Sequence, residues 1–560
     1  MSGTGVDEVF DVSPHAQALS YRLLDEPDSF TLPRKLKIAF SASDADRSGS
    51  RFSDIGFLAR DREGARGFAV FAGGGMGSRP RVASLLFAFI GESEIWVTAE
   101  AIKRVFDAQG DRTDKHRNRL RFLTQTLGFE RFRELVEQEI ARLKRRTDWP
   151  LSLEGIRLTE TIPRSGDREH RLERAQGDEF GHEPNVTSSE FNQFRKRYVL
   201  REEGSDEAYC AKLPLPQGDL HHEHADAIAE FLAPYGEDVL RAAVNQNLYA
   251  RHLPVAALSE IYEHARRAGA LVDTAPLISE LVTCTGAATC RLGITLSRSV
   301  ANATVEHLEQ AGIDLDDHSD LRLKFSGCPN SCGRHWVADL GFFGAAGRLG
   351  NRLYPTYKVV AGAGPAEFAR EMGEVPARSV PEFVAAVLQA RRSSSIRSDS
   401  FGDWVRAGGK AELKRLVEQF DTVSAFEADS TSYYDWGATE IFSLAGRRAG
   451  ECSAGMYDLI EADKRELLGL RNRQLTDETA RALVSAAARM LLITRGESAR
   501  DDSGAKQAFR RHFIETGLID ATYAELLERE ITAADAARAR ELADAVVALY
   551  RRMDHTLSFR

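Results

Sequence analysis

Apolar and polar residues alternate in a short stretch near the beginning of the chain. In residues 32–40 the apolar Leu36 and Ile38 are separated by the basic Lys35 and Lys37. Because successive side chains of a strand point to opposite faces, the alternation predicts a strand with both lysines on one face and both apolar residues on the other. From the pattern alone, a solvated strand face explains the lysines as well as a binding role does.

A helical period, with apolar residues three and four positions apart, dominates the end of the chain. One run precedes a second that follows a capping-box pair, Thr532 and Asp535. The apolar positions are Ala480, Leu483, Val484, Ala487, Met490 and Leu491 in the first run, and Leu542, Val546, Leu549, Tyr550 and Met553 in the second. These runs predict a small helical bundle, similar to the HEPN-type bundles.

Strand and helix patterns alternate in the middle of the chain. A strand and turn are predicted over 208–219, a helix over 224–232, a strand over 239–249 and a helix from Leu258 to Gly269. This order favours an α+β layer fold with ferredoxin-like half-domains. The polar stretch 163–188, nearly free of aliphatic residues, predicts a mobile connection.

The sequence also repeats itself at an offset of 285 residues, which predicts a duplicated, pseudo-symmetric unit. Lys37 meets Arg322 in this register. The matched residues are Leu36, Phe40, Ser41, Asp54, Gly56 and Phe57 in the first copy, and Leu321, Phe325, Ser326, Asp339, Gly341 and Phe342 in the second. We expect the two copies to face each other, with the first offering its basic strand to whatever the second holds.

The length of 560 residues exceeds what one core supports, and the patterns predict five segments. They are 1–30 (the remnant of an N-terminal region), 31–160 (the first repeat), 161–275 (a ferredoxin-like half-domain with a polar linker), 276–406 (the second repeat) and 407–560 (a helical domain). The net charge of −10 argues against a general nucleic-acid binder. Without a signal-peptide pattern or a long apolar run, we expect a cytoplasmic protein that is not in a membrane.

Four of the six cysteines lie in two clusters, Cys284-Thr-Gly-Ala-Ala-Thr-Cys290 and Gly327-Cys-Pro-Asn-Ser-Cys-Gly333. Thiolates from two loops can converge on one soft-metal centre. Zinc fits poorly, since its cysteines are usually two to four residues apart. Disulfides are disfavoured in a reducing compartment. Glycine, proline and asparagine around the second pair predict a tight loop whose N–H groups point at sulfurs, so an iron–sulfur cluster is the leading interpretation.

In the first copy Ser43 and Arg47 occupy the cysteine positions, so only the second copy can carry a metal. The cysteine pattern resembles that of the sirohaem-containing sulfite and nitrite reductases, over roughly residues 5–406. That resemblance implies a [4Fe–4S] cluster ligated by Cys284, Cys290, Cys328 and Cys332, with Cys332 also bridging to the sirohaem iron.

The same resemblance implies contacts to substrate and macrocycle. Lys35 and Lys37 would bind and protonate the small anionic substrate. The expected sirohaem contacts are Arg34, Arg112, Arg117, Gln246, Asn247 and Asn330.

The resemblance implies an oxidoreductase that reduces sulfite to sulfide. Lys37 favours sulfite, because nitrite-reducing relatives tend to carry asparagine there; nitrite reduction to ammonia remains the alternative. No G-x-G-x-x-G fingerprint is evident, so electrons should come from a separate ferredoxin or flavoprotein. Family members usually have a segment before the region matching 7–10 that supplies further arginines, so we expect either that the start of this chain is truncated or misassigned, or that the protein binds sirohaem with a depleted anion pocket.

Two rival functions remain open. One is a non-catalytic redox sensor that keeps a cluster, favoured by the added C-terminal bundle. The other is a related enzyme of cobalamin synthesis, which Lys35 and Lys37 disfavour. Two further motifs, Tyr433-Tyr-Asp-Trp-Gly-Ala-Thr-Glu440 and Glu451-Cys452, have no evident mechanism, and we expect Cys452 to be structural.

Overall fold

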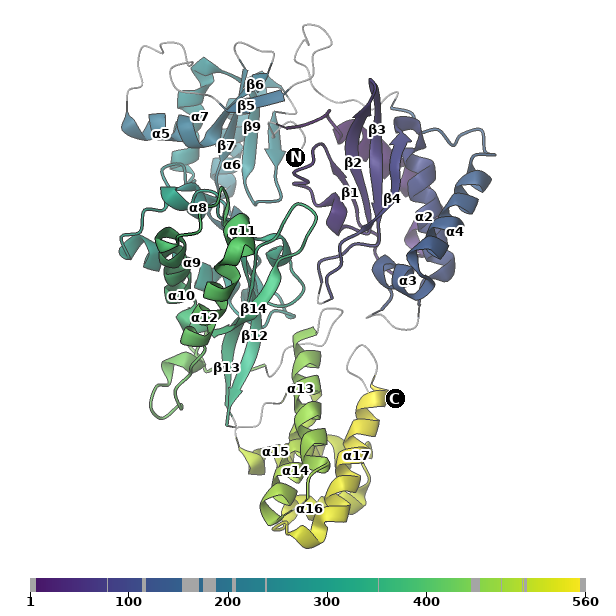
Figure 1. The fold of residues 1–560 in the computed structure, drawn as a ribbon, viewed down its shortest axis with the longest axis vertical. Helices are drawn as coiled ribbons and strands as arrows, with labels where there is room; N and C mark the ends of the chain where they lie inside the picture. Colours follow the sequence, from purple (N-terminus) through teal and green to yellow (C-terminus); the bar gives the residue numbers. More distant parts are fainter. Residues whose placement is uncertain are drawn as a thin grey trace. The chain divides into compact units, whose positions relative to one another are not determined.

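The computed structural model describes residues 7–77, 79–112, 117–153, 171–174, 188–203, 208–236, 239–350, 352–444, 454–474, 476–495, 497 and 501–553. The chain divides into two units (Figure 1). The first comprises Met1–Val282, Asp314–Leu323 and Ala363–Phe368, and the second Thr283–Ile313, Lys324–Gly362 and Ala369–Arg560. Among the described helices, none combines the length and apolar character needed to cross a membrane.

The first unit begins with helix α1 (Ser13–Leu24) and a four-stranded sheet in the order β1-β2-β3-β4. Its strands are β1 (Ile38–Ser41), β2 (Ile55–Arg62), β3 (Ala65–Ala72) and β4 (Ser84–Gly91). β1 pairs parallel to β2, and the other neighbours are antiparallel. The helices that follow are α2 (Ile95–Gln109), α3 (Leu120–Leu127) and α4 (Phe129–Leu143). Phe57, Phe68 and Trp96 lie in the core between these helices and the sheet.

The predicted alternation before β1 is confirmed. Leu36 and Ile38 pack against the core of this sheet, whereas Lys35 and Lys37 are exposed. The strand is shorter than predicted and starts at Ile38. The backbone N–H of Lys37 donates to the Asp54 carboxylate at 2.8 Å, so a side chain takes the place of a strand partner there.

The first unit contains a second, antiparallel sheet in the order β5-β6-β7-β9-β8. Its strands are β5 (Arg171–Arg174), β6 (Val199–Glu203), β7 (Ala208–Leu213), β8 (Leu240–Ala242) and β9 (Leu248–Pro254). Helices α5 (Ser189–Tyr198), α6 (His222–Leu232) and α7 (Leu258–Arg267) accompany it. Phe194, Ile261 and Leu253 are fully buried in their common core.

Two predictions in this region are wrong. Residues 239–249 form a hairpin rather than one strand, because the Gln246 N–H donates to the Ala243 carbonyl at 3.1 Å and Gln246 takes a φ of 64°. Within the expected mobile connection, residues 171–174 form β5 and pair with β6. The rest of that stretch up to residue 187 lies outside the described residues.

The second unit carries a sheet in the order β10-β11-β12-β13-β14. Its strands are β10 (Val282–Thr283), β11 (Leu323–Ser326), β12 (Leu340–Leu349), β13 (Arg352–Ala361) and β14 (Arg370–Pro376). Helices α9 (Ser297–Gln310), α10 (Val380–Ser393) and α12 (Lys410–Phe420) pack beside it (Figure 1).

The duplication predicted from the sequence is confirmed in detail. Phe40 stacks on Phe57 with ring centroids 4.7 Å apart, and Phe325 stacks on Phe342 at 4.8 Å. The loops after β1 and β11 also agree, since Asp46 has a φ of 47° and its counterpart Ser331 a φ of 58°. The two copies therefore share a backbone, down to a left-handed residue at the same place.

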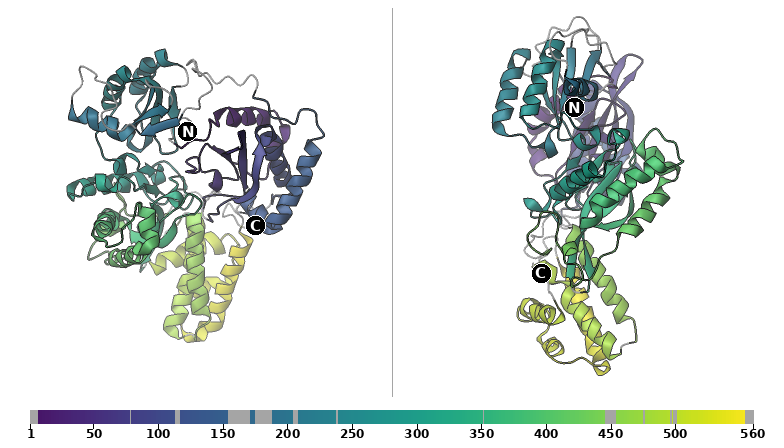
Figure 2. Two further views of the ribbon diagram at one scale, coloured as in Figure 1. Left: turned by 45° about the horizontal axis from the view of Figure 1, so that its top comes forward. Right: turned by 90° about the vertical axis from the view of Figure 1, so that its left-hand side faces the viewer.

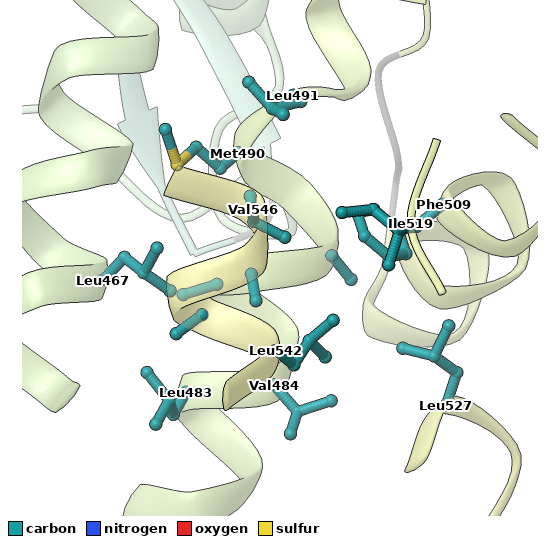
Figure 3. Packing of buried hydrophobic residues seen from close by; sticks show 14 of the residues in the cluster. Leu467, Leu483, Val484, Met490, Leu491, Phe509, Ile519, Leu527, Leu542 and Val546 are labelled. Carbon is teal, nitrogen blue, oxygen red and sulfur yellow. The ribbon is translucent and has the colours of Figure 1, made fainter. Parts of the chain in front are cut away.

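The C-terminal helical bundle is also confirmed. Its helices are α13 (Ala454–Arg471), α14 (Asp477–Met490), α15 (Asp502–Phe509), α16 (Ala524–Glu528) and α17 (Ala536–Arg552). The yellow-green helices lie against one another in both views of Figure 2. Leu467, Leu483, Leu542 and Val546 meet in the core shown in Figure 3. The predicted capping box forms: Asp535 accepts from the Thr532 N–H at 3.0 Å.

Candidate functional site

The first cysteine loop follows directly from β10. The Cys284 N–H donates to the Phe325 carbonyl on β11 at 3.1 Å, which ties the loop to the sheet. A single helical turn at Gly286–Ala288 then lets the Cys290 N–H reach the Gly286 carbonyl at 3.0 Å. Both cysteines are thus held at the two ends of one short turn, and both are half-buried.

The second cysteine loop follows β11. Cys328 is buried and Cys332 is exposed. Ser331, between them, adopts a φ of 58°, and the Arg334 N–H donates to its carbonyl at 2.9 Å. This turn folds the chain back so that both cysteines lie in a loop of six residues between β11 and Gly333, rather than along an extended strand. None of the five cysteines in the described part of the chain forms a disulfide.

Backbone hydrogen bonds join the two cysteine loops. The Gly327 carbonyl accepts from the Ile294 N–H at 2.7 Å and from the Thr295 N–H at 3.0 Å. A Cβ at Gly327 would lie 2.6 Å from the Cα of Gly286, so a larger residue would push the loops apart. The two cysteine loops therefore lie against each other at Gly327, where only glycine fits.

Donors point at two of the cysteine sulfurs. The Gly327 N–H donates to Cys284 Sγ at 3.1 Å, and the Asn330 side-chain amide donates to Cys328 Sγ at 3.1 Å. Such donors stabilise thiolates, the form that ligates iron. Burial nevertheless raises the pKa of the Cys328 thiol to about 12, and the nearby Cys284 and Cys332 add to the rise. Cys328 will therefore lose its proton when a metal competes for the sulfur.

The sulfurs around a single zinc ion lie close together. Four sulfurs at 2.3 Å from one zinc would lie about 3.8 Å apart. Across the described residues, the only set of three metal-binding side chains whose ligand atoms all lie within 4.8 Å of one another is Glu26, Asp28 and Glu100. No three of the described cysteine sulfurs form such a set. The acidic set is itself neutralised by Lys103, 2.5 Å from Asp28 and 2.8 Å from Glu100.

The lysines predicted to bind the anion lie in the first unit. Lys35 and Lys37 are exposed on one face of the segment before β1, and Arg34 is half-buried. The fully buried Asp54 anchors this segment, because it accepts from the Lys37 N–H and also pairs with Arg119 at 2.5 Å. The ammonium groups of Lys35 and Lys37 are therefore carried by a backbone segment that the Asp54–Arg119 ion pair holds in place.

The other predicted sirohaem contacts occupy varied settings. Arg112 donates to the Thr31 carbonyl at 2.8 Å and pairs with Asp107 at 2.7 Å, and Arg117 is exposed. Gln246 lies in the β8–β9 turn. The buried Asn247 amide accepts from the Leu215 N–H at 2.9 Å and donates to the Ser279 carbonyl at 3.1 Å, a structural role within the first unit. Contacts of these residues to a macrocycle stay predictions.

Two arginines that the sequence did not reveal as site residues, Arg119 and Arg121, are half-buried and buried near the glycine turn at 73–77. Arg121 is only 7% exposed, and its Nη1 lies 2.5 Å from where a Cβ at Gly75 would be. Burial, followed by the charge of Arg119, lowers the pKa of Arg121 to about 10. A buried cation beside another cation favours an anionic neighbour. The every-other-residue spacing of Arg117, Arg119 and Arg121 is the signal that could reveal them.

Comparisons with known proteins bear on the whole fold. Residues 1–144 match the family model "Nitrite and sulphite reductase 4Fe-4S domain", which covers the cysteine-free copy. The structure of the NirA protein of Mycobacterium tuberculosis has the same fold, with a TM-score of 0.58 and 23% identity over 74% of this chain and 70% of that one.

Three curated relatives are similar over most of the chain. The assimilatory ferredoxin-dependent nitrite reductase of Haloferax mediterranei is 24% identical over 75% of this chain and 69% of its own length. The ferredoxin–nitrite reductase of Synechococcus elongatus is 27% identical over 71% and 72%. The sulfite reductase [ferredoxin] 1 of Mycolicibacterium paratuberculosis is 24% identical over 74% and 69%.

Fold, duplication and relatives agree with the donor set of the two cysteine loops. The matched family model describes a 4Fe-4S domain, and the three relatives are named as reductases of nitrite or sulfite. Over 71–75% of its length the chain is therefore similar to sulfite and nitrite reductases, and residues 1–144 match the model of their 4Fe-4S domain.

Proposed function

We propose that this chain reduces sulfite to sulfide, with Cys284, Cys290, Cys328 and Cys332 as the cluster ligands and Cys332 also bonded to the sirohaem iron. The observation that supports this best is the pair of cysteine loops pinned together at Gly327, with N–H donors 3.1 Å from Cys284 Sγ and Cys328 Sγ. Loops held in this way keep their thiolates in place through repeated changes of cluster charge.

The reduction of sulfite requires a supply of single electrons and a source of protons. Sulfite takes up six electrons and six protons to give sulfide and three waters, and the cluster and sirohaem together supply single electrons and an open iron site. In this proposal Lys35 and Lys37 bind the dianion and donate protons to oxygens that depart as water. Arg34, Arg112, Arg117, Gln246, Asn247 and Asn330 are the proposed sirohaem contacts.

Nitrite is the alternative substrate. Relatives of both kinds resemble this chain at 24–27% identity, so similarity does not choose between the two anions. We favour sulfite because Lys37 places a second ammonium group two residues from Lys35, and sulfite carries more negative charge than nitrite. For the electron donor we propose a ferredoxin, since all three relatives are named as ferredoxin-dependent, with a flavoprotein as the alternative.

The test uses the full chain, purified without oxygen. Absorption and EPR spectra should show both a cluster and sirohaem, and reduced methyl viologen with sulfite should yield sulfide. Nitrite in place of sulfite, with ammonia as the readout, measures the preference directly. The Cys332→Ser variant serves as the control for background reduction. Higher kcat/KM for nitrite would replace the sulfite assignment, and a cluster without turnover of either anion would favour the non-catalytic alternative.

A further inference from the structure

The motif at 433–440, which the catalytic account leaves unused, lies against the cysteine loops. The buried carboxylate of Asp435 accepts from the Leu296 N–H at 2.7 Å with one oxygen and from the Trp436 N–H at 2.9 Å with the other. Leu296 follows Thr295, whose N–H is bonded to the Gly327 carbonyl. The Asp435 carboxylate is therefore connected to both cysteine loops. It accepts from Leu296 N–H, and the adjacent Thr295 N–H donates to Gly327 in the second loop.

The rest of the motif fixes Asp435 in place. The Trp436 indole donates to the Ala377 carbonyl at 2.7 Å, and Arg378 lies over the Trp436 ring at 4.6 Å. Arg378 also donates to the Tyr434 carbonyl at 3.1 Å. Gly437 takes a φ of 72°, and a Cβ there would lie 3.0 Å from the Ser299 hydroxyl on α9. These contacts explain why tryptophan and glycine follow the carboxylate in the sequence.

The end of the same segment covers a cluster ligand. Phe442 and Leu444 form one apolar group with Ile294 and Cys328, in which every member is at most 8% exposed. Ile493, from the helical bundle, packs against this group. The backbone reinforces the fold, since the Phe442 N–H donates to the Tyr433 carbonyl at 2.8 Å. Cys328 is thereby shut off from water on that side by residues that lie more than a hundred positions further along the chain.

We propose that residues 433–444, the clasp, lock the two cysteine loops together and seal the Cys328 side of the cluster, so that the clasp sets how fast the cluster loses iron. The proposal rests on the proposed ligation by the four cysteines. Apolar residues around a metal site control the access of solvent, and hydrogen bonds to the ligating segments hold the ligands in position. Asp435 is in this view a positioning residue, acting through Leu296 rather than on the substrate.

The experiment follows iron release to an excess of chelator under argon, together with the EPR spectrum of the reduced cluster. Asp435→Ala and the double variant Phe442→Ala/Leu444→Ala should release iron about ten-fold faster than the unmodified chain, a typical effect of residues that support metal ligands. Asp435→Asn keeps an oxygen that can accept from Leu296 N–H, so it should restore slow release. Leu232→Ala, a Leu→Ala deletion in the buried core of the other unit, should release iron at the unmodified rate.

The outcomes separate the two proposals. Fast release in both clasp variants, with altered EPR line shape in Asp435→Ala and rescue by Asp435→Asn, supports the clasp. Release at the unmodified rate in all clasp variants, from a chain that does hold a cluster, overturns the clasp and leaves the ligation by cysteines intact. Equal acceleration in Leu232→Ala also overturns it, because general destabilisation would then explain the effect. A chain that assembles no cluster at all overturns both proposals.

Discussion

In the first copy of the duplicated unit the loop after β1 is closed by a carboxylate, whereas the equivalent loop of the second copy carries cysteines. Asp46 Oδ1 accepts from both the N–H and the hydroxyl of Ser50 at 2.7 Å, and its Oδ2 accepts from the Arg51 N–H at 2.9 Å. Ser331 stands in its place in the second copy, with the same left-handed backbone. Among the described residues the buried Ser331 hydroxyl has no hydrogen-bond partner.

This difference shows which part of the loop is structural. Both copies keep the stacked phenylalanine pair and a glycine, Gly56 or Gly341, in tight contact with the backbone of the preceding turn. The packing of the sheet therefore determines the conformation of the loop, whether the loop carries a carboxylate or cysteines. The first loop is satisfied by its own carboxylate and needs no ligand. The second lacks that carboxylate, and its cysteine sulfurs accept the donors instead.

Removing a cysteine from the second copy should have the largest effect, because it removes the feature that distinguishes the two copies. Cys328→Ser should abolish the cluster and with it nearly all sulfite reduction, because a hydroxyl is a poor ligand for iron beside three thiolates. Iron and acid-labile sulfide contents measure the loss. Ser43→Ala, at the matching place in the first copy, is the control and should leave both contents unchanged. An iron content in Cys328→Ser equal to that of the control would contradict the assignment of this ligand.

Removing the Asp46 side chain should lower the stability of the protein far more than removing the Ser331 hydroxyl at the matching position. Asp46→Ala leaves three donors without their acceptor in a site where Asp46 is only 4% exposed, and should cost about 3 kcal/mol of stability. Ser331→Ala removes a hydroxyl that accepts and donates nothing in the described part of the chain and should change stability by less than about 0.5 kcal/mol.

The midpoint of denaturant unfolding, followed by near-ultraviolet circular dichroism, measures both. Asp46→Asn is an intermediate control, since its amide oxygen can still accept one or two of the donors. Similar midpoints for Asp46→Ala and Ser331→Ala would show that the carboxylate does not close the loop.

Lys37 and Arg322 occupy equivalent places in the two copies and are both exposed. If only the first copy binds substrate, Lys37→Ala should lower kcat/KM for sulfite about ten- to a hundred-fold, in the range expected for a group that transfers protons. Arg322→Ala removes the same charge from the other copy and should change kcat/KM less than about two-fold, because an exposed charge that does not bind the substrate is screened by salt. Equal losses in the two variants would place the effect in the overall field of the protein.

The sequence predicts the features that rest on local pattern. Residue spacing alone is enough to recognise three features: the four cysteines, the repeat at an offset of 285 residues, and the alternation at Lys35 and Lys37. The helical bundle follows from its apolar period. For the hairpin at 239–249 the pattern fails, since apolar residues on both sides of the turn read as one continuous strand.

Other features depend on contacts between distant parts of the chain. Asp435 accepts from the Leu296 N–H, although the two residues are more than a hundred positions apart in the sequence. A local sequence pattern cannot predict which backbone N–H a carboxylate will accept from. The burial of Arg121 against Gly75 is of the same kind. The motif at 433–440 is visible in the sequence, but its role appears only with the fold. Cys452 and Glu451 lie outside the described residues.

The smallest effect concerns pH, at the position where the first copy has Ser50 and the second His335. Burial lowers the pKa of His335 from 6.5 to about 3, and its Nδ1 lies 2.9 Å from the Ser326 hydroxyl. Below pH 6.5 the unfolded chain binds a proton that the folded chain refuses, so stability should fall as pH falls from 6.5 toward 3, by about 1.4 kcal/mol per pH unit. Denaturant midpoints of the anaerobic protein between pH 7 and pH 5 measure this slope before most carboxylates titrate. His335→Gln, which cannot take up the proton, should flatten the slope by about one proton. A slope in His335→Gln equal to that of the unmodified chain would mean that the acid sensitivity of the second copy comes from its thiolates and not from this imidazole.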